Sequence, residues 1–374
     1  MKRLGIGSWL VLLFLLTACG QAAKTTDTTP LKIGAILPLT GVMAVYGESQ
    51  QKSLQLALDQ ANQAGGVAGR QLELLLQDNR STPKDAVTAA QALLQQNPFA
   101  TFSTMTPTSA PLAPIFAQAQ RLLLIGGSIS PLLAPQSRYI FKDYADVRDW
   151  AGSLARVATA KNLQRLSLLV FQTEQGDLFI KHFQANYSTA FANLQRFDIT
   201  EKDFRSYLIK SKGAKADGVV FVGYPDNNAL VLRQMYELNF VVPTLLINGA
   251  WPKVTENPIA ANALQPITTW YTYDEHNQDL PTVKFRADYQ QMYGEEPDQE
   301  AAYVYDTVQL LLNAMRGCVS QGQLDKECVT DGMLATKDYP GVAGTVSFDA
   351  DGNSQRPTKL VQFKDGAWQN YLAQ

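Results

Sequence analysis

Hydrophobic and polar positions alternate along the chain in two different patterns from Leu31 onward. Short apolar runs such as residues 31–37 are typical of strands that are buried on both faces. Between these runs lie stretches such as residues 48–64, where apolar side chains recur every three or four positions, as on one face of a helix. The first part of the chain has predicted strands at 31–37, 71–77, 99–102 and 121–125, and predicted helices at 48–64, after Pro83, and at 109–120. Strands separated by helices predict a parallel sheet covered on both faces.

The same alternation restarts after Asp143 with a second series of similar length. Its predicted helices and strands are helices 146–160, 176–194, 201–210 and 226–238 and strands 165–171, around Phe197, 218–223 and 244–248. A second series of this size favours two α/β lobes over one large sheet. After residue 271 the pattern predicts helices 281–293 and 300–315. A terminal β-hairpin, with strands in the sequences VSFD and KLVQF, is predicted to follow them.

The amino-terminal segment has the pattern of a secretory signal peptide. Lys2 and Arg3 precede an apolar run at residues 9–16, so we predict a signal peptide over residues 1–18. This run is too short to cross a bilayer, which needs about 20 apolar residues. No later segment is long and apolar enough to do so, and we expect no membrane-spanning helix in the mature protein.

The sequence Leu-Thr-Ala-Cys at residues 16–19 resembles the bacterial lipobox, in which the cysteine thiol is acylated after cleavage. We therefore predict lipidation of Cys19; a soluble secreted protein with a cysteine at this place is the alternative. Gly20, rather than Asp, follows the cysteine, which leaves the choice of membrane open. Residues 19–30 contain few large apolar side chains and should form a flexible tether.

Composition and charge exclude several classes of function. The 374 residues are enough for about two domains. Lys and Arg number 32 against 34 Asp and Glu, so the net charge gives no basic surface for nucleic acid. Two His and three Cys are too few for most zinc or iron sites, and we expect no metal and no cofactor. In an oxidising compartment Cys318 and Cys328 are expected to form a disulfide; a redox pair is the alternative, but the Cys-x-x-Cys spacing is missing.

The motifs of common enzymes are also missing. Neither His182 nor His276 follows a G-x-S-x-G nucleophile turn, which argues against a serine hydrolase. The glycines at 65–69 come after a helix and before a strand, the wrong order for a phosphate-binding loop. The sequence Asp-Ala-Asp-Gly at 349–352 lacks the remaining ligands of a calcium loop and favours a turn. We expect a protein that is not an enzyme.

Ligands of open α/β sheets bind beyond the carboxyl ends of the strands. The predicted strand ends lead into loops that are rich in hydroxyl, amide, glycine and aromatic residues, at 38–47, 103–109, 126–131, 172–176, 224–228 and 249–252. Such loops suit hydrogen bonding to a small polar ligand together with stacking against its body.

Several of these stretches together resemble the extracytoplasmic solute-binding proteins for branched-chain amino acids, the type I periplasmic binding proteins of ABC importers. The matching sequences are KIGAILPLTG at 32–41, Tyr46-Gly47, GGVAGR at 65–70, EKDF at 201–204, Gly223-Tyr224, Tyr305-Asp306 and GVAGTVSFD at 341–349. Many members of this family also carry a disulfide where Cys318 and Cys328 stand. The resemblance implies two Rossmann-like lobes joined by three crossings. Lobe 1 would comprise residues 31–143 and 272–349, and lobe 2 residues 144–271 and 350–374.

The resemblance also implies which residues bind ligand. Members of the family hold an α-carboxylate with hydroxyl and backbone N–H groups of two first-lobe loops, and here the corresponding hydroxyl groups belong to Thr106, Thr108, Ser128 and Ser130. Simple helix capping is the alternative role for these side chains. Tyr46 and Tyr224 stand at aromatic positions that line the cleft in the family, although a buried Tyr is more often part of a core.

The chain departs from the family at two places that bear on the ligand. Gln175 stands where amino-acid binders have an aromatic residue, and Asn248, Gly249 and Trp251 stand near the position of an acid for the α-ammonium group. A buried ammonium group needs an anionic partner. Either another carboxylate serves, with Asp226 and Asp149 favoured over Asp306, or the ligand is not an α-amino acid.

The function that follows is that of a lipid-anchored solute-binding protein, in the periplasm or at the cell surface. It would be a monomer that captures a small polar ligand in a cleft between the lobes and delivers it to an ABC permease in the inner membrane. The expected ligand is an amino acid, with the branched-chain amino acids as the first candidates. A sensor or regulatory lipoprotein of the same fold, responding to amides or activating cell-wall enzymes, is the alternative that the sequence leaves open.

Overall fold

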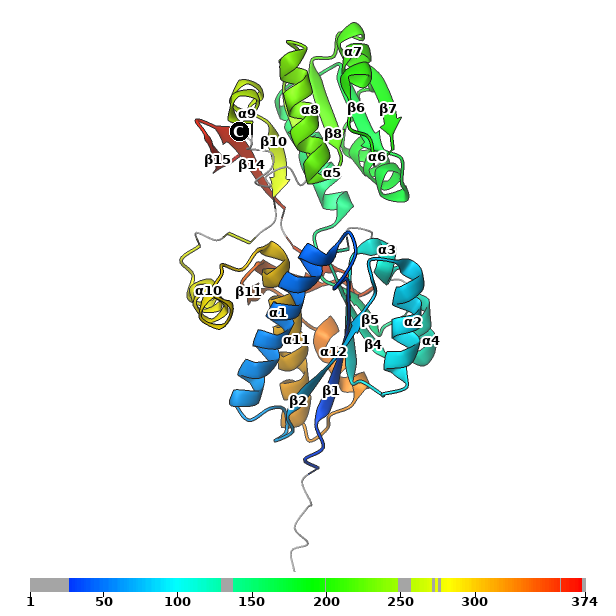
Figure 1. The fold of residues 1–374 in the computed structure, drawn as a ribbon, viewed down its shortest axis with the longest axis vertical. Helices are drawn as coiled ribbons and strands as arrows, with labels where there is room; N and C mark the ends of the chain where they lie inside the picture. The colour runs from blue at the N-terminus through cyan, green and yellow to red at the C-terminus, as the bar shows by residue number, and fades with distance from the viewer. Residues whose placement is uncertain are drawn as a thin grey trace, which may run out of the picture.

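The strands fall into two large helix-flanked sheets, which a computed structural model shows arranged end to end (Figure 1). The structure describes residues 27–128, 137–198, 200–247, 257–270, 273–274, 277–356 and 358–371. No helix in these ranges is long and apolar enough to cross a membrane. The predicted α/β class with two sheet-centred lobes is confirmed.

The first large sheet is parallel and five-stranded, in the order β2-β1-β3-β4-β5. Its strands are β1 (Leu31–Leu37), β2 (Leu72–Asp78), β3 (Ala100–Thr104), β4 (Leu122–Gly126) and β5 (Ile140–Lys142). The helices that follow its first strands are α1 (Ala44–Gln63), α2 (Pro83–Leu94), α3 (Thr106–Ser109) and α4 (Leu112–Ala119). The central strands are almost fully buried, as expected where helices cover both faces of a sheet.

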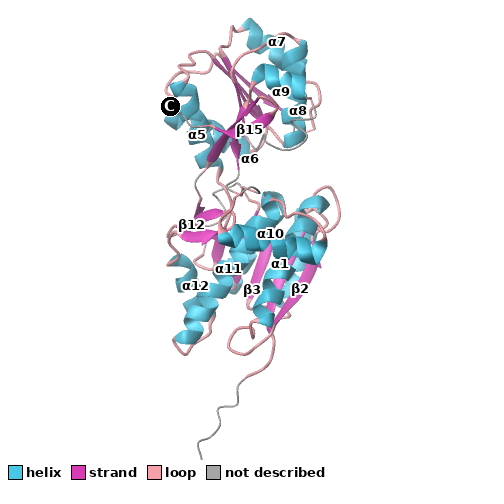
Figure 2. Ribbon diagram, turned by 90° about the vertical axis from the view of Figure 1, so that its left-hand side faces the viewer, coloured by secondary structure: helices cyan, strands magenta, loops and turns pink. Residues whose placement is uncertain are grey.

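The second large sheet has seven strands in the order β15-β14-β10-β9-β8-β6-β7. Its parallel strands are β6 (Leu166–Phe171), β7 (Asn193–Phe197), β8 (Gly218–Val222), β9 (Thr244–Leu246) and β10 (Ile267–Trp270). Antiparallel strands β14 (Lys359–Lys364) and β15 (Ala367–Asn370) extend it beyond β10. The helices of this lobe are α5 (Val147–Ala160), α6 (Glu174–Asn186), α7 (Arg205–Gly213), α8 (Pro225–Glu237) and α9 (Pro258–Leu264). The side view in Figure 2 shows helices lying along this sheet.

A small third sheet and three helices complete the first lobe (Figure 2). They are α10 (Leu280–Tyr293), α11 (Gln299–Ser320), α12 (Lys326–Leu334), β11 (Tyr339–Gly341), β12 (Gly344–Phe348) and β13 (Ser354–Gln355). The predicted terminal hairpin is wrong, because β12 pairs with β11 and β13, whereas β14 pairs with β10 and β15. The turn at 349–352 therefore joins β12 to β13, and the chain reaches β14 only after Arg356 is anchored in the first lobe.

Several predicted helices have different limits in the structure. Helix α7 begins at Arg205 rather than 201, and α11 extends to Ser320 rather than 315; three other differences have a local cause. Helix α1 begins at Ala44 rather than 48. Its first turn packs closely against the loop after β1, which is possible because Gly47 has no side chain; a Cβ there would lie 2.2 Å from the Pro38 carbonyl oxygen. The predicted helix 109–120 is two helices, α3 and α4, interrupted before Leu112 by Pro111, which has no N–H to donate. Helix α6 ends at Asn186 rather than 194, because residues 193–197 pair with β6 as strand β7.

Buried ion pairs join segments that lie far apart in the sequence. Arg356 donates hydrogen bonds to both carboxylate oxygens of Asp143, at 2.7 and 2.9 Å, and to Oδ2 of Asp306 at 3.2 Å. All three side chains are almost completely buried. Asp306 also accepts hydrogen bonds from the backbone N–H groups of Val342 and Ala343. These contacts hold two segments against helix α11, the one directly after β5 and the one directly after β13.

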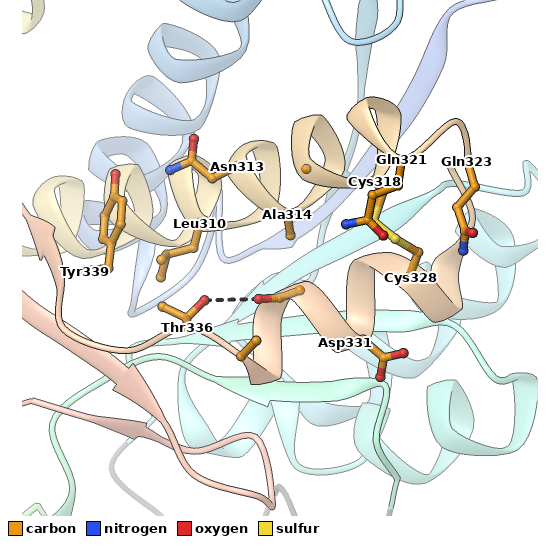
Figure 3. A pocket seen from close by; sticks show the side chains of 13 residues that line it. Leu310, Asn313, Ala314, Cys318, Gln321, Gln323, Cys328, Asp331, Thr336 and Tyr339 are labelled. Atoms are coloured by element: carbon orange, nitrogen blue, oxygen red, sulfur yellow. Dashed lines mark hydrogen bonds between the residues drawn. A yellow bond between two sulfur atoms is a disulfide. The ribbon is translucent and has the colours of Figure 1, made fainter.

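Cys318 and Cys328 form the predicted disulfide, with 6.0 Å between their Cα atoms. The bond joins the end of α11 to α12 at one end of a groove of about 500 Å³ between these helices (Figure 3). Asn313 and Tyr339 lie toward the other end of the groove, away from the disulfide. The disulfide is a structural link between two helices, as predicted.

Candidate ligand-binding site

Two hydroxyl groups meet where the neighbouring strands β3 and β4 end. The Oγ1 atom of Thr106, at the start of α3, lies 3.1 Å from Oγ of Ser128, in the loop after β4. Both loops turn sharply, since Met105 and Gly127 have φ angles of 66° and 58°. A hydrogen bond from the Met105 N–H to the Gly126 carbonyl oxygen, 3.1 Å long, holds the loops together. The hydroxyls that the sequence assigned to two separate loops thus form one pair.

The other predicted hydroxyl residues of the first lobe differ in position. Thr108 is buried, and its hydroxyl group donates to the carbonyl oxygen of Thr104 at 2.6 Å. This bond supports the turn after β3. It is not the helix capping named as the alternative, because the hydroxyl group donates to a carbonyl oxygen and the N-cap residue of α3 is Met105, which makes no side-chain cap. Ser130 lies outside the described residues, and so do Asn248, Trp251 and Cys19; their predicted roles stay predictions.

Tyr46 lies on the first turn of α1 rather than in a loop, because the helix begins early. Burial raises the pKa of its hydroxyl group to about 12, and the charge of Glu300 adds to this effect. Tyr224 and Asp226 raise the pKa of Tyr46 further. Since both belong to the start of α8 in the second lobe, the starts of α1 and α8 face each other across the two lobes.

Tyr224 occupies the N-cap position of α8, and loss of hydration raises the pKa of its hydroxyl group. Its ring stacks on that of Phe171, with centroids 5.8 Å apart and planes 9° from parallel. Phe171 ends β6, and Gln175 follows it in the first turn of α6, where it is half-buried. We call Tyr46, Thr106, Ser128, Gln175 and Tyr224 the interlobe site.

The candidate carboxylates for an ammonium group have distinct surroundings. Asp226 is exposed in the first turn of α8, beside Tyr224. Asp149 lies in the first turn of α5, where loss of hydration and the charge of Asp146 raise its pKa. Asp306, the least favoured in sequence, is held in the buried cluster with Arg356. Of the three, the charge of Asp226 alone is among those that raise the pKa of Tyr46 most.

The sequence did not point to Glu300, which is buried in the first turn of α11. Burial and the charge of Asp298 raise its pKa to about 7, although hydrogen bonds from Tyr144 and Gln50 favour the ionised form. An acidic residue in the first turn of a helix is common at the surface, where it interacts favourably with the helix dipole. No signal in a single sequence distinguishes a buried one.

A family model described as periplasmic binding protein matches residues 30–367, most of the chain. The chain belongs to the periplasmic binding protein family. The resemblance found in the sequence motifs is thereby confirmed. This family consists of extracytoplasmic substrate-binding proteins of ABC transporters, which are not enzymes, as predicted.

Relatives of this periplasmic binding protein cover it almost completely. It is 24% identical over 356 residues to the Leu/Ile/Val-binding protein homolog 2 of Brucella abortus (strain 2308). The alignment covers 91% of this chain and 92% of that protein. It is 22% identical over 344 residues to a leucine-, isoleucine-, valine-, threonine-, and alanine-binding protein of Pseudomonas aeruginosa, with 89% and 90% covered.

Solved structures share its fold. The branched-chain amino acid transporter substrate binding protein LivJ of Streptococcus pneumoniae, in complex with isoleucine, has a TM-score of 0.78 at 24% identity; 91% of this chain and 98% of that chain are covered. The leucine binding protein LivK of Thermotoga maritima also has a TM-score of 0.78, at 22% identity and with the same coverage. The type I periplasmic binding protein fold, with its two Rossmann-like lobes and three-crossing hinge, is therefore confirmed.

Proposed function

We propose that this protein is a lipid-anchored solute-binding protein that captures an amino acid, first of all a branched-chain one, between its lobes and delivers it to an ABC permease. The observation that carries the proposal is the interlobe site itself. A pair of hydroxyl groups from the ends of β3 and β4 lies in the first lobe, where Tyr46 faces Tyr224 and Asp226 of the second lobe. Relatives named for binding leucine, isoleucine and valine agree with it.

The first-lobe hydroxyls of Thr106 and Ser128 suit an α-carboxylate. Each can donate one hydrogen bond, and bonds to a charged acceptor are about twice as strong as those between neutral groups. Their hydrogen bond to each other is easily exchanged for bonds to a carboxylate, since either oxygen can be the donor. Thr108 would keep the turn after β3 in shape beneath the ligand.

We assign the α-ammonium group to Asp226, with Asp149 as the second candidate. Asp226 is the acidic residue in the first turn of α8, beside Tyr224. Its charge is among those that raise the pKa of Tyr46 in the other lobe, which supports Asp226 as the partner of a ligand bound near Tyr46. Gln175, half-buried in the first turn of α6, would contact the side chain of the ligand together with Asn248 and Trp251.

Closure of the lobes would couple ligand capture to delivery. A ligand that touches both lobes binds the closed state more tightly and shifts the population toward it. We propose the lobe limits given by the sequence, with one change: because β13 pairs with β12 and Arg356 binds Asp143, residues 350–356 belong with the first lobe. The last crossing then lies between Arg356 and Lys359, and the permease would recognise the closed form.

The amino-terminal segment would tether the protein outside the cell membrane. Removal of residues 1–18 and acylation of Cys19 would leave the protein as a monomer on a short tether, in the periplasm or at the cell surface. Globomycin, which blocks the lipoprotein signal peptidase, should cause the uncleaved precursor to accumulate in the native host. A Cys19→Ala variant should be released from membranes, and retention of this variant would contradict the lipid anchor.

Thermal-shift screening of the purified protein tests the ligand class. A ligand at about 100 times its dissociation constant adds about 2.7 kcal/mol of stability, which raises the melting temperature by a few degrees. We expect leucine, isoleucine or valine to produce this shift. A response only to small amides, urea or aromatic carboxylates, with none to any amino acid, would refute the proposed ligand class.

A further inference from the structure

A buried carboxyl group lies directly behind the loops that carry Thr106 and Ser128. Glu300 of α11 is 2% exposed. Its Oε1 accepts a hydrogen bond from the Tyr144 hydroxyl group at 2.6 Å, and its Oε2 accepts one from Nε2 of Gln50 at 3.0 Å. A Cβ added to Gly127 would lie 3.4 Å from Oε2 of Glu300, so the carboxyl group packs against the residue next to Ser128.

In the part of the chain that the structure describes, no ion pair balances a negative charge on Glu300. Among the described residues Glu300 takes part in no ion pair, because Lys52 of α1 pairs with Glu48 and Glu295, and Arg356 pairs with Asp143 and Asp306. The titratable groups that do face it are Tyr46 of α1, Tyr144 of the first crossing and Asp298 at the start of α11. None of these three groups can supply a positive charge to the Glu300 carboxylate.

The two hydrogen-bond partners can serve either charge state of Glu300. Tyr144 can donate to a carboxylate or accept from a carboxylic acid. Gln50 donates in the arrangement described, while its Oε1 is buried and has no hydrogen-bond partner among the described residues. A flip of the amide would turn that oxygen toward Glu300, where it could accept the acid proton. Neither partner therefore holds the carboxyl group in one form.

We propose that Glu300 is a specificity-determining residue, which takes up a proton from solvent when the carboxylate of the ligand binds at Thr106 and Ser128. This inference rests on the proposed function. Two carboxylates close together in a site with little water disfavour the doubly ionised state, so one of them becomes protonated. The proton adds to Glu300, and the acid O–H then donates to Gln50 or Tyr144. That burial already raises the pKa of Glu300 to about 7 agrees with this role.

The consequence is that the site admits a carboxylate only together with a proton. Above about pH 7 the affinity for leucine should fall, by up to about tenfold for each pH unit, because Glu300 must be protonated before the ligand binds. Leucine itself keeps both of its charges in this range, so the dependence would report on the protein. A ligand that carries an ammonium group but no carboxylate would show the opposite trend, since it favours the ionised form.

Isothermal titration calorimetry with L-leucine tests the inference. At about pH 7.5, measured in two buffers with different ionisation enthalpies, the wild-type protein should take up between about 0.5 and 1 proton for each ligand bound. A Glu300→Gln variant, which keeps the shape and the hydrogen bonds of a neutral acid, should take up none, and its affinity should not change between about pH 6 and pH 8. Glu296→Gln, at an exposed loop carboxylate, is the matched control and should behave as the wild type.

The outcomes separate this inference from the proposed function. Leucine binding without proton uptake in the wild-type protein, or with the same pH dependence in E300Q, would overturn the role of Glu300 and leave the proposed function intact. Proton release would overturn it as well, since it would place the ammonium group beside the carboxylate. If leucine, isoleucine and valine do not bind the wild-type protein at any pH, both the proposed function and this inference fail.

Discussion

Replacement of Arg356 by Met should destabilise the folded protein strongly. The guanidinium group makes five hydrogen bonds, to Asp143, to Asp306 and to the carbonyl oxygens of Ala343 and Gly344. It also lies over the ring of Tyr303, 4.6 Å from its centroid. Met has a similar length and keeps part of the packing, but it leaves two buried carboxylates without a cation.

The size of the loss follows from burial. Removal of one partner from a buried ion pair costs about 3 to 5 kcal/mol, because the remaining charge has neither water nor a counter-ion. Such a cost is a large part of the roughly 5 to 15 kcal/mol that stabilises a typical domain. Burial already raises the pKa of Asp306 to about 6 although the Arg356 charge opposes this shift, so loss of the cation should raise that pKa further in the folded variant. Protonation of Asp306 then favours the folded state, so the loss in R356M should shrink as the pH falls.

Urea unfolding, followed by tryptophan fluorescence at neutral pH, measures this loss. Arg205→Met is the matched control, since Arg205 forms ion pairs with Asp203 and Glu237 at the surface, where water and salt screen the charges. We expect R356M to unfold at a much lower urea concentration than the wild-type protein, and R205M to unfold near it. Equal unfolding midpoints for R356M and R205M would refute the stabilising role of the buried cluster.

Two further predictions concern the ammonium partner and the disulfide. Asp226→Asn should weaken L-leucine binding by about 10- to 100-fold, because it removes the negative charge that we assign as the partner of the ammonium group. Calorimetry measures the affinity, with Asp149→Asn as the control. Weaker binding in D149N but not in D226N would identify Asp149 as the ammonium partner instead. Replacing Cys318 and Cys328 by Ser should lower the free energy of unfolding by about 2 to 3 kcal/mol, since the bond closes a short loop with a sequence separation of 10. Denaturant unfolding of the oxidised wild-type protein and the double variant measures this difference in the free energy of unfolding. A difference below about 0.5 kcal/mol would contradict the stabilising role of the disulfide.

Much of the fold could be predicted because strands and helices differ in apolar period. Strand β1 has the predicted limits, and β3, β4, β6 and β8 lie within one or two residues of theirs. Short elements without a clear period, such as β5 and β13, were missed. The pairing of the carboxyl-terminal strands was predicted wrongly, because a single sequence does not reveal that Arg356, between β13 and β14, is anchored on Asp143.

The part of the candidate site that lies directly after strands could be predicted from the sequence. Thr106 and Ser128 follow neighbouring strands, so their meeting could be expected from the parallel order, although their 3.1 Å contact could not. Tyr46 was expected in a loop, because Gly47 is typical of a turn. The sequence does not show that the glycine is needed instead for the close approach of the Pro38 backbone. Glu300 could not be found at all, since its burial depends on α1 and on Tyr144, which are distant in the sequence.

The affinity of the wild-type protein, Thr106→Val and Tyr224→Ala for L-leucine, measured side by side by calorimetry, tests most directly whether both lobes hold one ligand. Thr106→Val removes the hydroxyl group of the first lobe with little change in shape, and Tyr224→Ala removes the ring that stacks on Phe171 in the second. We expect the wild-type protein to bind leucine and each variant to bind it at least about tenfold more weakly. Leucine binding that neither substitution weakens would contradict a ligand site between the lobes.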